Sequence, residues 1–220
     1  SPSVSGAVDE DSVTAAVRAA QYNSLPELQE LLDVGKITPN TRDGEDCTLL
    51  QWAAINNRKN IVAELLERGA DANAAGGFLK ETALQWAVRQ GALEAIVVLV
   101  EQGGADPHIA GTEGLNALHL AIQGRKPDVL LYLCATHPSL CHAPTSAAAS
   151  LPHAPPVMYL VAQWAKGQRA GSPGMHHHER VADRKRWQNM LRSLLAFGAD
   201  VFAQQKATGD SALHLGVSVK

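Results

Sequence analysis

The sequence predicts an all-α fold, a solenoid of stacked helix-turn-helix units with projecting turns, and two recurring motifs carry this prediction. The first motif reads TLLQWA at 48–53, TALQWA at 82–87 and NALHLA at 116–121, so its copies begin 34 residues apart. The second motif, Gly-Ala-Asp, stands at 69–71, 104–106 and 198–200, and a fourth copy of the first motif, SALHLG, follows at 211–216. A fixed period of roughly 20–50 residues indicates repeats that stack on their neighbours.

Each repeat is expected to contain two short helices and a turn. Thr48 and Thr82 stand where a hydroxyl group caps the first helix, and the Leu and Ala residues that follow give that helix an apolar face. The second helix carries an apolar stripe, at 61–66 in one repeat and at 96–100 in the next. The Gly of Gly-Ala-Asp suits the left-handed backbone of a helix C-cap. Such short helices cannot bury their apolar faces alone, so the repeats must stack.

The motifs divide the chain into a terminus and six repeats. We expect residues 1–11 to be a flexible N-terminus and residues 12–220 to be one repeat domain. The predicted repeats are 12–41, 42–75, 76–110, 111–143, a degenerate repeat at 154–203 and a truncated one at 204–220. The degenerate repeat is expected to hold an insertion, 167–179, between its two helices. Because the last repeat stops after its first helix begins, we expect the parent protein to continue.

Composition excludes several classes of partner. Lys and Arg number 19 against 22 Asp and Glu, a formal charge of −3, which argues against nucleic acid or an anionic membrane as partner. No run of about 18 apolar residues exists, so no membrane insertion is expected in this segment. The three cysteines, Cys47, Cys134 and Cys141, show no CxxC spacing, which favours a reducing cytosolic compartment over a disulfide framework or a zinc site.

The residues capable of chemistry are better explained without catalysis. The cluster His176–His178 is expected to lie in a solvated loop, since adjacent side chains point in different directions and no further ligand has helical spacing with them. His119 and His214 occupy a fixed position of the repeat, where the side chain ties neighbouring repeats by hydrogen bonds. Arg180 and the run 184–186 are expected to form a solvated helix face. We therefore expect no enzyme activity, no cofactor and no metal in this segment.

What remains is the concave groove of the solenoid, where two tryptophans stand out. Trp52 and Trp86 share a column that Leu120 and Leu215 fill in other repeats. Trp52 is expected to pack between repeats, whereas Trp86 offers an apolar ring and one N–H donor, which suits stacking on a proline. Asn56, one turn beyond Trp52, is either an ordinary helix-end residue or a clamp for the backbone of an extended peptide.

The repeated motifs closely resemble those of the ankyrin repeat. More specifically, TLLQWAAINNR at 48–58, GG at 76–77 with WAVRQG at 86–91, and AAQY at 19–22 resemble the ankyrin domains of DHHC-type palmitoyltransferases. The relatives meant are the huntingtin-interacting acyltransferases and the yeast ankyrin-repeat acyltransferases. The resemblance covers about residues 12 to 125.

The resemblance implies a cytosolic module that recruits substrates to a membrane-anchored acyltransferase. In that family the groove binds extended client segments in which β-branched residues precede Gln-Pro, and the residues matching Asn56 and Trp86 carry the recognition. We take as the candidate peptide-binding set Asn56, Trp86, Trp52, Asn57, Arg89 and Gln90. One departure is that Gln51 and Gln85 replace the His that usually precedes the Trp, so the hydrogen bonds between repeats must differ.

The resemblance also sets expectations for the parent protein. Its DHHC catalytic motif would lie outside this chain, in a multi-pass protein of the Golgi or another endomembrane, with the repeats on the cytoplasmic face. We expect the segment to be monomeric in isolation. One alternative is a generic scaffold that binds a folded partner through its turn tips. A third interpretation, a metal-dependent or thiol enzyme, would need the histidine cluster or the pair Cys134 and Cys141.

Overall fold

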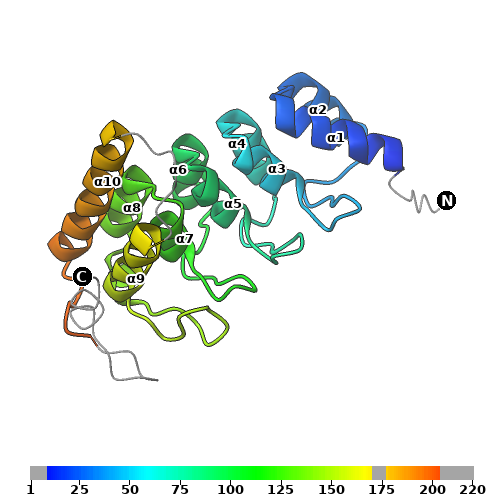
Figure 1. Ribbon diagram of the computed structural model, residues 1–220. Helices are drawn as coiled ribbons and strands as arrows, with labels where there is room; N and C mark the ends of the chain where they lie inside the picture. Colours follow the sequence, from blue (N-terminus) through cyan, green and yellow to red (C-terminus); the bar gives the residue numbers. More distant parts are fainter. Residues whose placement is uncertain (1–8, 170–176, 204–220) are drawn as a thin grey trace. The chain divides into compact units, whose positions relative to one another are not determined.

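The computed structural model describes residues 9–169 and 177–203, and the chain divides into two compact parts, Ser1–Asp106 and Pro107–Lys220 (Figure 1). The first part contains six helices: α1 (Glu10–Tyr22), α2 (Leu25–Asp33), α3 (Leu49–Ile55), α4 (Lys59–Glu67), α5 (Ala83–Gln90) and α6 (Leu93–Glu101). The second contains α7 (Ala117–Gln123), α8 (Pro127–Thr136), the 3-10 helix η1 (Pro138–His142), α9 (Pro156–Arg169) and α10 (His177–Ala196). The predicted all-α repeat fold is confirmed.

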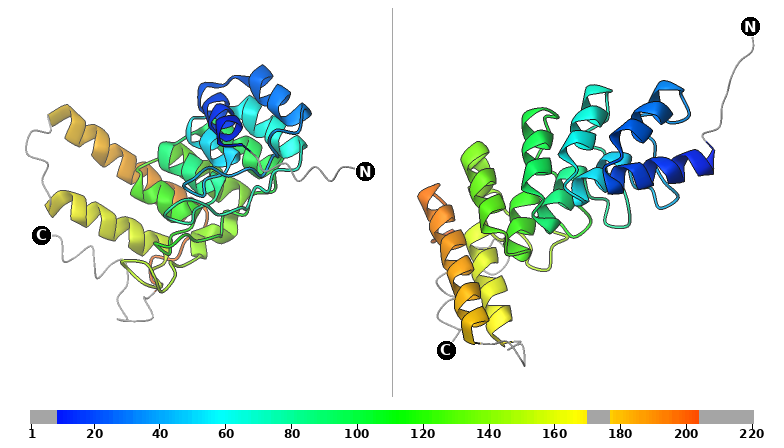
Figure 2. Two further views of the ribbon diagram at one scale, coloured as in Figure 1. Left: turned by 90° about the vertical axis from the view of Figure 1, so that its right-hand side faces the viewer. Right: turned by 90° about the horizontal axis from the view of Figure 1, so that it is seen from above.

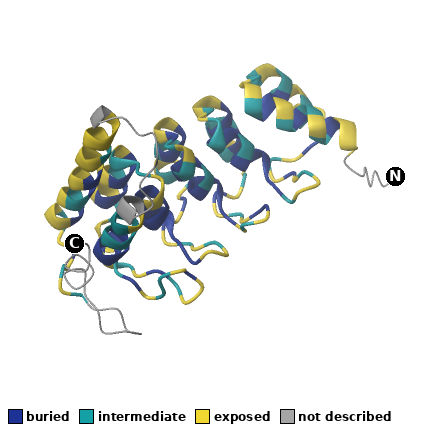
Figure 3. Cartoon of the chain, viewed as in Figure 1, coloured by how far each residue is buried: buried dark blue, intermediate teal, exposed yellow. Residues whose placement is uncertain are grey.

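Within the first part the helices pack as the repeat predicts. Each repeat pairs its two helices, α1 with α2, α3 with α4 and α5 with α6, and the first helices line up as α1, α3 and α5 (Figures 1 and 2). Buried residues lie on the faces where these helices meet, and most of them are Leu, Ile, Val and Ala (Figure 3). Helices of seven to nine residues are too short to be stable alone, so this packing holds them.

The first helices α3 and α5 each begin at a capping box. The Thr48 hydroxyl accepts the N–H of Gln51 at 3.1 Å, and the Gln51 side-chain oxygen accepts the N–H of Thr48 at 2.7 Å. Thr82 and Gln85 form the same reciprocal pair at the start of α5. The two threonine caps are thus confirmed, and the glutamines that depart from the family pattern complete them.

Gln51 also joins two repeats. Its side chain is fully buried, and its Nε2 donates to the backbone oxygen of Glu81, 2.6 Å away and immediately before the cap of α5. A second kind of hydrogen bond between repeats occurs twice in the first part of the chain. The side-chain oxygen of Asn40 accepts the N–H of Asp71, and that of Asn73 accepts the N–H of Asp106, each at 2.8 Å. The Asp of Gly-Ala-Asp is therefore anchored through its backbone to the preceding repeat.

The boundaries of two predicted segments, 1–11 and 167–179, differ in the structure. Helix α1 already begins at Glu10 with Asp9 as its N-cap, inside the terminus assigned to 1–11. Helices α9 and α10 extend into the segment 167–179, because α9 runs to Arg169 and α10 starts at His177. His177 and His178 therefore begin a helix and do not lie in the loop expected for the histidine cluster. His176, His214, residues 1–8 of the predicted N-terminal segment and the predicted repeat 204–220 lie outside the described residues.

His119 is buried, but it does not form the hydrogen bonds between repeats that were predicted from its position in the repeat. Among the described residues neither ring nitrogen has a hydrogen-bond partner, and the ring instead meets Tyr159 edge to face, with centroids 5.3 Å apart. Asn116 caps α7 through the backbone N–H of His119, so the ring is not needed for the cap. Burial lowers the pKa of His119 to about 3, which keeps the ring neutral.

Replacing Gln51 by Leu should lower the free energy of unfolding by about 2 kcal/mol or more, because the Thr48 N–H and the Glu81 oxygen lose their partner in the core. Urea denaturation followed by circular dichroism measures the loss. Gln102→Leu makes the same change at an exposed helix end, and its effect should stay within about 0.5 kcal/mol. Equal stabilities of the two variants would contradict the role of Gln51.

His119 should make stability depend on pH. Its pKa rises from about 3 in the folded chain to its ordinary 6.5 on unfolding, so the unfolded state takes up the proton first. Stability is full above pH 6.5 and falls by about 1.4 kcal/mol per pH unit below it, down to the folded pKa. His119→Gln, which restores the residue of the earlier repeats, should remove that part of the slope in urea titrations at pH 7 and pH 5. An unchanged slope would show that His119 is not buried neutral.

Candidate functional site

Trp52 and Trp86 come together because they hold equivalent positions in neighbouring repeats. Trp52 lies on α3 and Trp86 on α5, helices that pack side by side. The rings meet edge to face, with centroids 5.6 Å apart and planes at 86°, a favoured geometry for aromatic pairs. Both side chains are half-buried, so each packs in the repeat and still reaches the surface.

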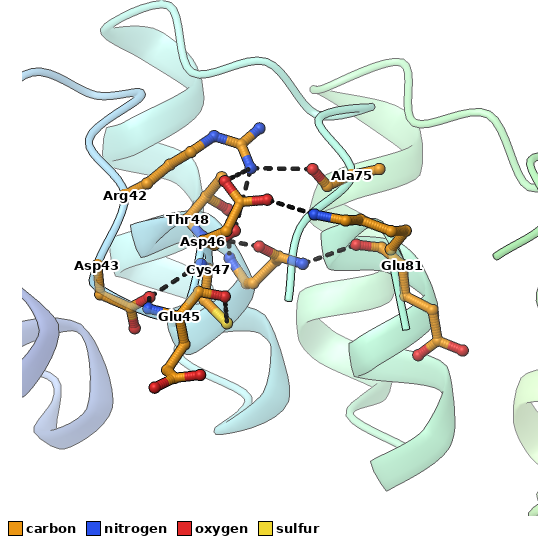
Figure 4. Close-up of polar contacts among 10 residues, drawn as sticks. Arg42, Asp43, Glu45, Asp46, Cys47, Thr48, Ala75 and Glu81 are labelled. Atoms are coloured by element: carbon orange, nitrogen blue, oxygen red, sulfur yellow. Dashed lines mark hydrogen bonds and ion pairs between the residues drawn. The ribbon is translucent and has the colours of Figure 1, made fainter. Parts of the chain in front are cut away.

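Trp52 is fixed by the turn that precedes α3. Its indole Nε1 donates to Oδ2 of Asp43 at 2.7 Å. The other oxygen of Asp43 accepts the backbone N–H groups of Glu45 and Cys47, at 3.0 and 2.9 Å. Figure 4 shows this turn, where Arg42 and Lys80 also pair with Asp46. The donor of Trp52 is therefore committed within the protein.

Trp86 is held only by packing. Its indole N–H has no hydrogen-bond partner among the described residues, in contrast to that of Trp52. The ring packs beneath Gly77, where a Cβ atom would lie 3.1 Å from Cζ2 of Trp86 and 3.2 Å from Sγ of Cys47. Gly77 also has a φ of 68°, so glycine is required there. The result is a positioned ring with one unused donor.

Cys47 belongs to the packing of this site. Its side chain is buried, and burial together with the nearby carboxylates of Asp43, Asp46 and Glu45 raises its pKa to about 11. The thiol is neutral at physiological pH, which makes it a small apolar residue and a poor nucleophile.

Asn56 closes α3 beside Trp52. It is half-buried, and its Nδ2 donates to the backbone oxygen of Trp52 at 2.9 Å. This is its one side-chain hydrogen bond within the described residues, so the second amide hydrogen and the amide oxygen stay available. Asn56 is thus a helix-end residue, one of the two interpretations considered from the sequence, and its amide keeps donor and acceptor capacity.

The other candidate residues have different surroundings. The side-chain oxygen of Asn57 accepts the N–H of Ala95 at 3.0 Å, so Asn57 caps the first turn of α6. Arg89 forms a bidentate ion pair with Glu81, which is only 2% exposed. Gln90 is exposed at the end of α5. Trp52 thus contacts both Trp86 and Asn56, whereas Asn57 and Arg89 hold the scaffold.

An open cleft of about 760 Å³ lies beside Asp43, the hydrogen-bond partner of Trp52. Its walls are Val13, Thr14 and Val17 on α1 and the turn that carries Thr38, Thr41 and Asp43. Asp43 is both a wall of the cleft and the acceptor for Trp52, which joins the two features. Sequence reasoning missed Asp43 and the cleft, because only the folded turn shows that it reaches back to the helix.

Two further observations concern metal ions and membranes. In the ranges 9–169 and 177–203, no set of three or more His, Cys, Asp or Glu side chains is placed to hold a metal ion. No helix in that same portion of the chain has both the length and the apolar character needed to cross a bilayer.

Comparison with known proteins gives both sequence relatives and structural neighbours. The chain is 46% identical over 104 residues to the palmitoyltransferase Hip14 of Drosophila melanogaster, which is 47% of this chain and 16% of that protein. It is 40% identical over 119 residues to the putative palmitoyltransferase ZDHHC13 of Danio rerio, 54% of this chain and 18% of the relative. The chain therefore spans less than a fifth of these relatives. The ankyrin repeat domain of Bcl-3 shares the fold, with a TM-score of 0.72 and 21% identity over 91% of this chain and 78% of that one.

A sequence profile of a known family matches most of the chain. The profile of ankyrin repeats in three copies matches residues 3–76 and 73–142. These ranges contain the capped helices α3, α5 and α7, the first two Gly-Ala-Asp motifs and the tryptophan pair described above. The ankyrin repeat is a protein-interaction module and not a catalytic domain. The chain belongs to the ankyrin-repeat family.

Proposed function

We propose that this chain recruits client proteins for a membrane-anchored protein S-palmitoyltransferase by binding an extended, proline-containing segment. The relatives support the role in palmitoylation, since they are palmitoyltransferases that match about half of this chain. The unequal use of the two tryptophans carries the role in peptide binding. The indole N–H of Trp52 donates to Asp43, whereas Trp86 has a fixed ring and an indole N–H without a partner among the described residues.

In the proposed complex Trp86 stacks on a client proline. A proline ring has no N–H to satisfy and presents a flat apolar face that matches an indole. Asn56 hydrogen-bonds the client backbone with the amide groups that its helix-capping bond leaves available. Trp52 supports the Trp86 ring from its edge, and Gly77 and Cys47 support it from the turn.

The cleft on α1 provides space for the rest of the segment. Val13 and Val17 offer an apolar wall, and Thr14, Thr38 and Thr41 offer hydroxyl groups to an extended backbone. This lining suits the β-branched residues that precede Gln-Pro in the clients of the resembled family. Peptide recognition of this kind relies on an exposed backbone, so it selects unfolded segments over folded surfaces.

Recruitment acts through effective concentration. A client held by a weak site tethered near a membrane active site is presented at roughly millimolar local concentration, without any new catalytic group. We place the chain accordingly on the cytoplasmic face of a Golgi or other endomembrane, with the acyltransferase in the remainder of the parent.

A second candidate function is binding of a folded partner through the turn tips, and one residue favours it. Phe78 is 94% exposed in the turn closed by the bridge between Gly76 and Glu81. A fully exposed aromatic side chain on a projecting turn is a typical interface anchor. This scaffold role would use Phe78 and leave Trp86 as a packing residue.

Titration of Gln-Pro peptides into the chain, measured by calorimetry, tests the proposal. We expect saturable binding that Trp86→Leu weakens by about 2 kcal/mol, roughly 30-fold, because loss of an aromatic anchor has that cost. Leu occupies the equivalent position at Leu120, so this variant keeps an apolar residue in the repeat. Asn56→Ala should also weaken binding.

The controls separate the two functions. Asn189→Ala changes an exposed Asn on α10 and should leave peptide affinity unchanged. Replacing the peptide proline by alanine should reduce binding to wild type but have little further effect on Trp86→Leu. Peptide binding that survives Trp86→Leu, or binding that only Phe78→Ala removes, would contradict the proposed site.

A further inference from the structure

Cys134 and Cys141 form a buried pair in the second part of the chain. Cys134 lies in the last turn of α8, and Cys141 lies in η1, the 3-10 helix that follows. Their Sγ atoms are 3.1 Å apart, within hydrogen-bonding contact of two thiols. The side chains are 0% and 1% exposed, and both cysteines are free. Nothing in the proposed binding of peptides by the first repeats uses them.

The pair lies close to the geometry of a disulfide. A disulfide bond has an S–S length of about 2.05 Å, so the sulfurs need to approach by about 1 Å. The segment that joins them can supply this movement. Ala135, Thr136, Pro138 and Ser139 are exposed, and a short 3-10 helix has weaker hydrogen bonds than an α-helix. Opening of η1 would also admit a small reagent to the buried sulfurs.

The two thiols are not equivalent. The hydrogen bond with Cys134 lowers the pKa of Cys141, whereas the same contact and burial raise the pKa of Cys134. Cys141 is thus the better nucleophile and Cys134 the resolving thiol. Its place on η1, the more exposed of the two elements, agrees with that assignment.

We propose that Cys134 and Cys141 are a redox modification site that a small-molecule disulfide, such as oxidised glutathione, converts into an intramolecular disulfide. The Cys141 thiolate attacks one sulfur of the reagent, which forms a mixed disulfide and releases one thiolate. The Cys134 thiol then loses its proton and attacks Sγ of Cys141, which releases the second thiolate. The two cysteines lose two electrons and two protons in all, and the reagent is reduced to two thiols.

The product would be a reversible covalent link between α8 and η1. Excess reducing thiol restores the two cysteines by the reverse exchange. The competing explanation is that both thiols only pack as small apolar residues, as Cys47 does. The two explanations differ in what the folded chain does with an oxidant.

The test incubates the whole folded chain with oxidised glutathione, followed by alkylation under denaturing conditions and mass spectrometry. We expect the count of free thiols to fall from three to one, with Cys47 alkylated and Cys134 and Cys141 protected until reduction. Before alkylation, the intact mass of the oxidised chain should be lower than that of the reduced chain by two hydrogens, with no glutathione retained. Three free thiols after oxidation, or loss of thiols without the Cys134–Cys141 link, would overturn the proposal.

Two variants test the order of attack. Cys134→Ser removes the resolving thiol, so glutathione should remain attached to Cys141. Cys141→Ser removes the attacking thiol, so Cys134 should react more slowly and form no internal disulfide. Equal reaction of Cys134 and Cys141 in the two variants would reject the assigned roles. Cys47→Ser is the control, and it should oxidise at Cys134 and Cys141 as the wild-type chain does.

Discussion

The buried side-chain amide of Gln51 is the interaction on which the candidate site depends. Its oxygen closes the cap of α3, and its nitrogen holds the backbone of Glu81 just ahead of α5. The Glu81 carboxylate in turn pairs with Arg89 at the other end of α5. Figure 4 shows Glu81 near the turn that carries Asp46 and Thr48. One amide therefore caps α3 and holds the residue that precedes the cap of α5, so it links the starts of the two helices on which Trp52 and Trp86 meet at 5.6 Å.

The site shows how a repeated scaffold produces unequal residues. Trp52 and Trp86 have the same place in their repeats, yet the turns beside them differ. The turn before α3 presents Asp43 to the indole of Trp52, and the turn before α5 presents Gly77 to the ring of Trp86. One ring becomes part of the scaffold and the other keeps its donor. In ankyrin repeats the turns vary more freely than the helices, so specificity arises there without loss of the stacked core.

The sequence predicts the helices, their caps and the pairing of repeats, because each follows from local residue types repeated at a fixed period. It cannot predict contacts that join distant positions. Asn57 caps a helix that begins 36 residues later at Leu93, and Arg89 meets a carboxylate buried by folding. The ring of His119 packs edge to face against Tyr159, a contact that the repeat pattern does not predict. The spacing of Cys134 and Cys141 matches no motif, since a helix end and a 3-10 turn bring them together.

The central claim, that Trp86 and not Trp52 offers its ring and donor to a client, can be tested on the indole N–H signals themselves. In a ¹⁵N-labelled sample the four tryptophans give four such signals, assigned with single Trp→Phe variants. We expect the Trp52 N–H to exchange slowly with solvent and its chemical shift to change little when a Gln-Pro peptide is added. The Trp86 signal should instead shift, and its proton should become protected from exchange with solvent. A peptide that binds while the Trp86 signal stays unchanged would contradict the account.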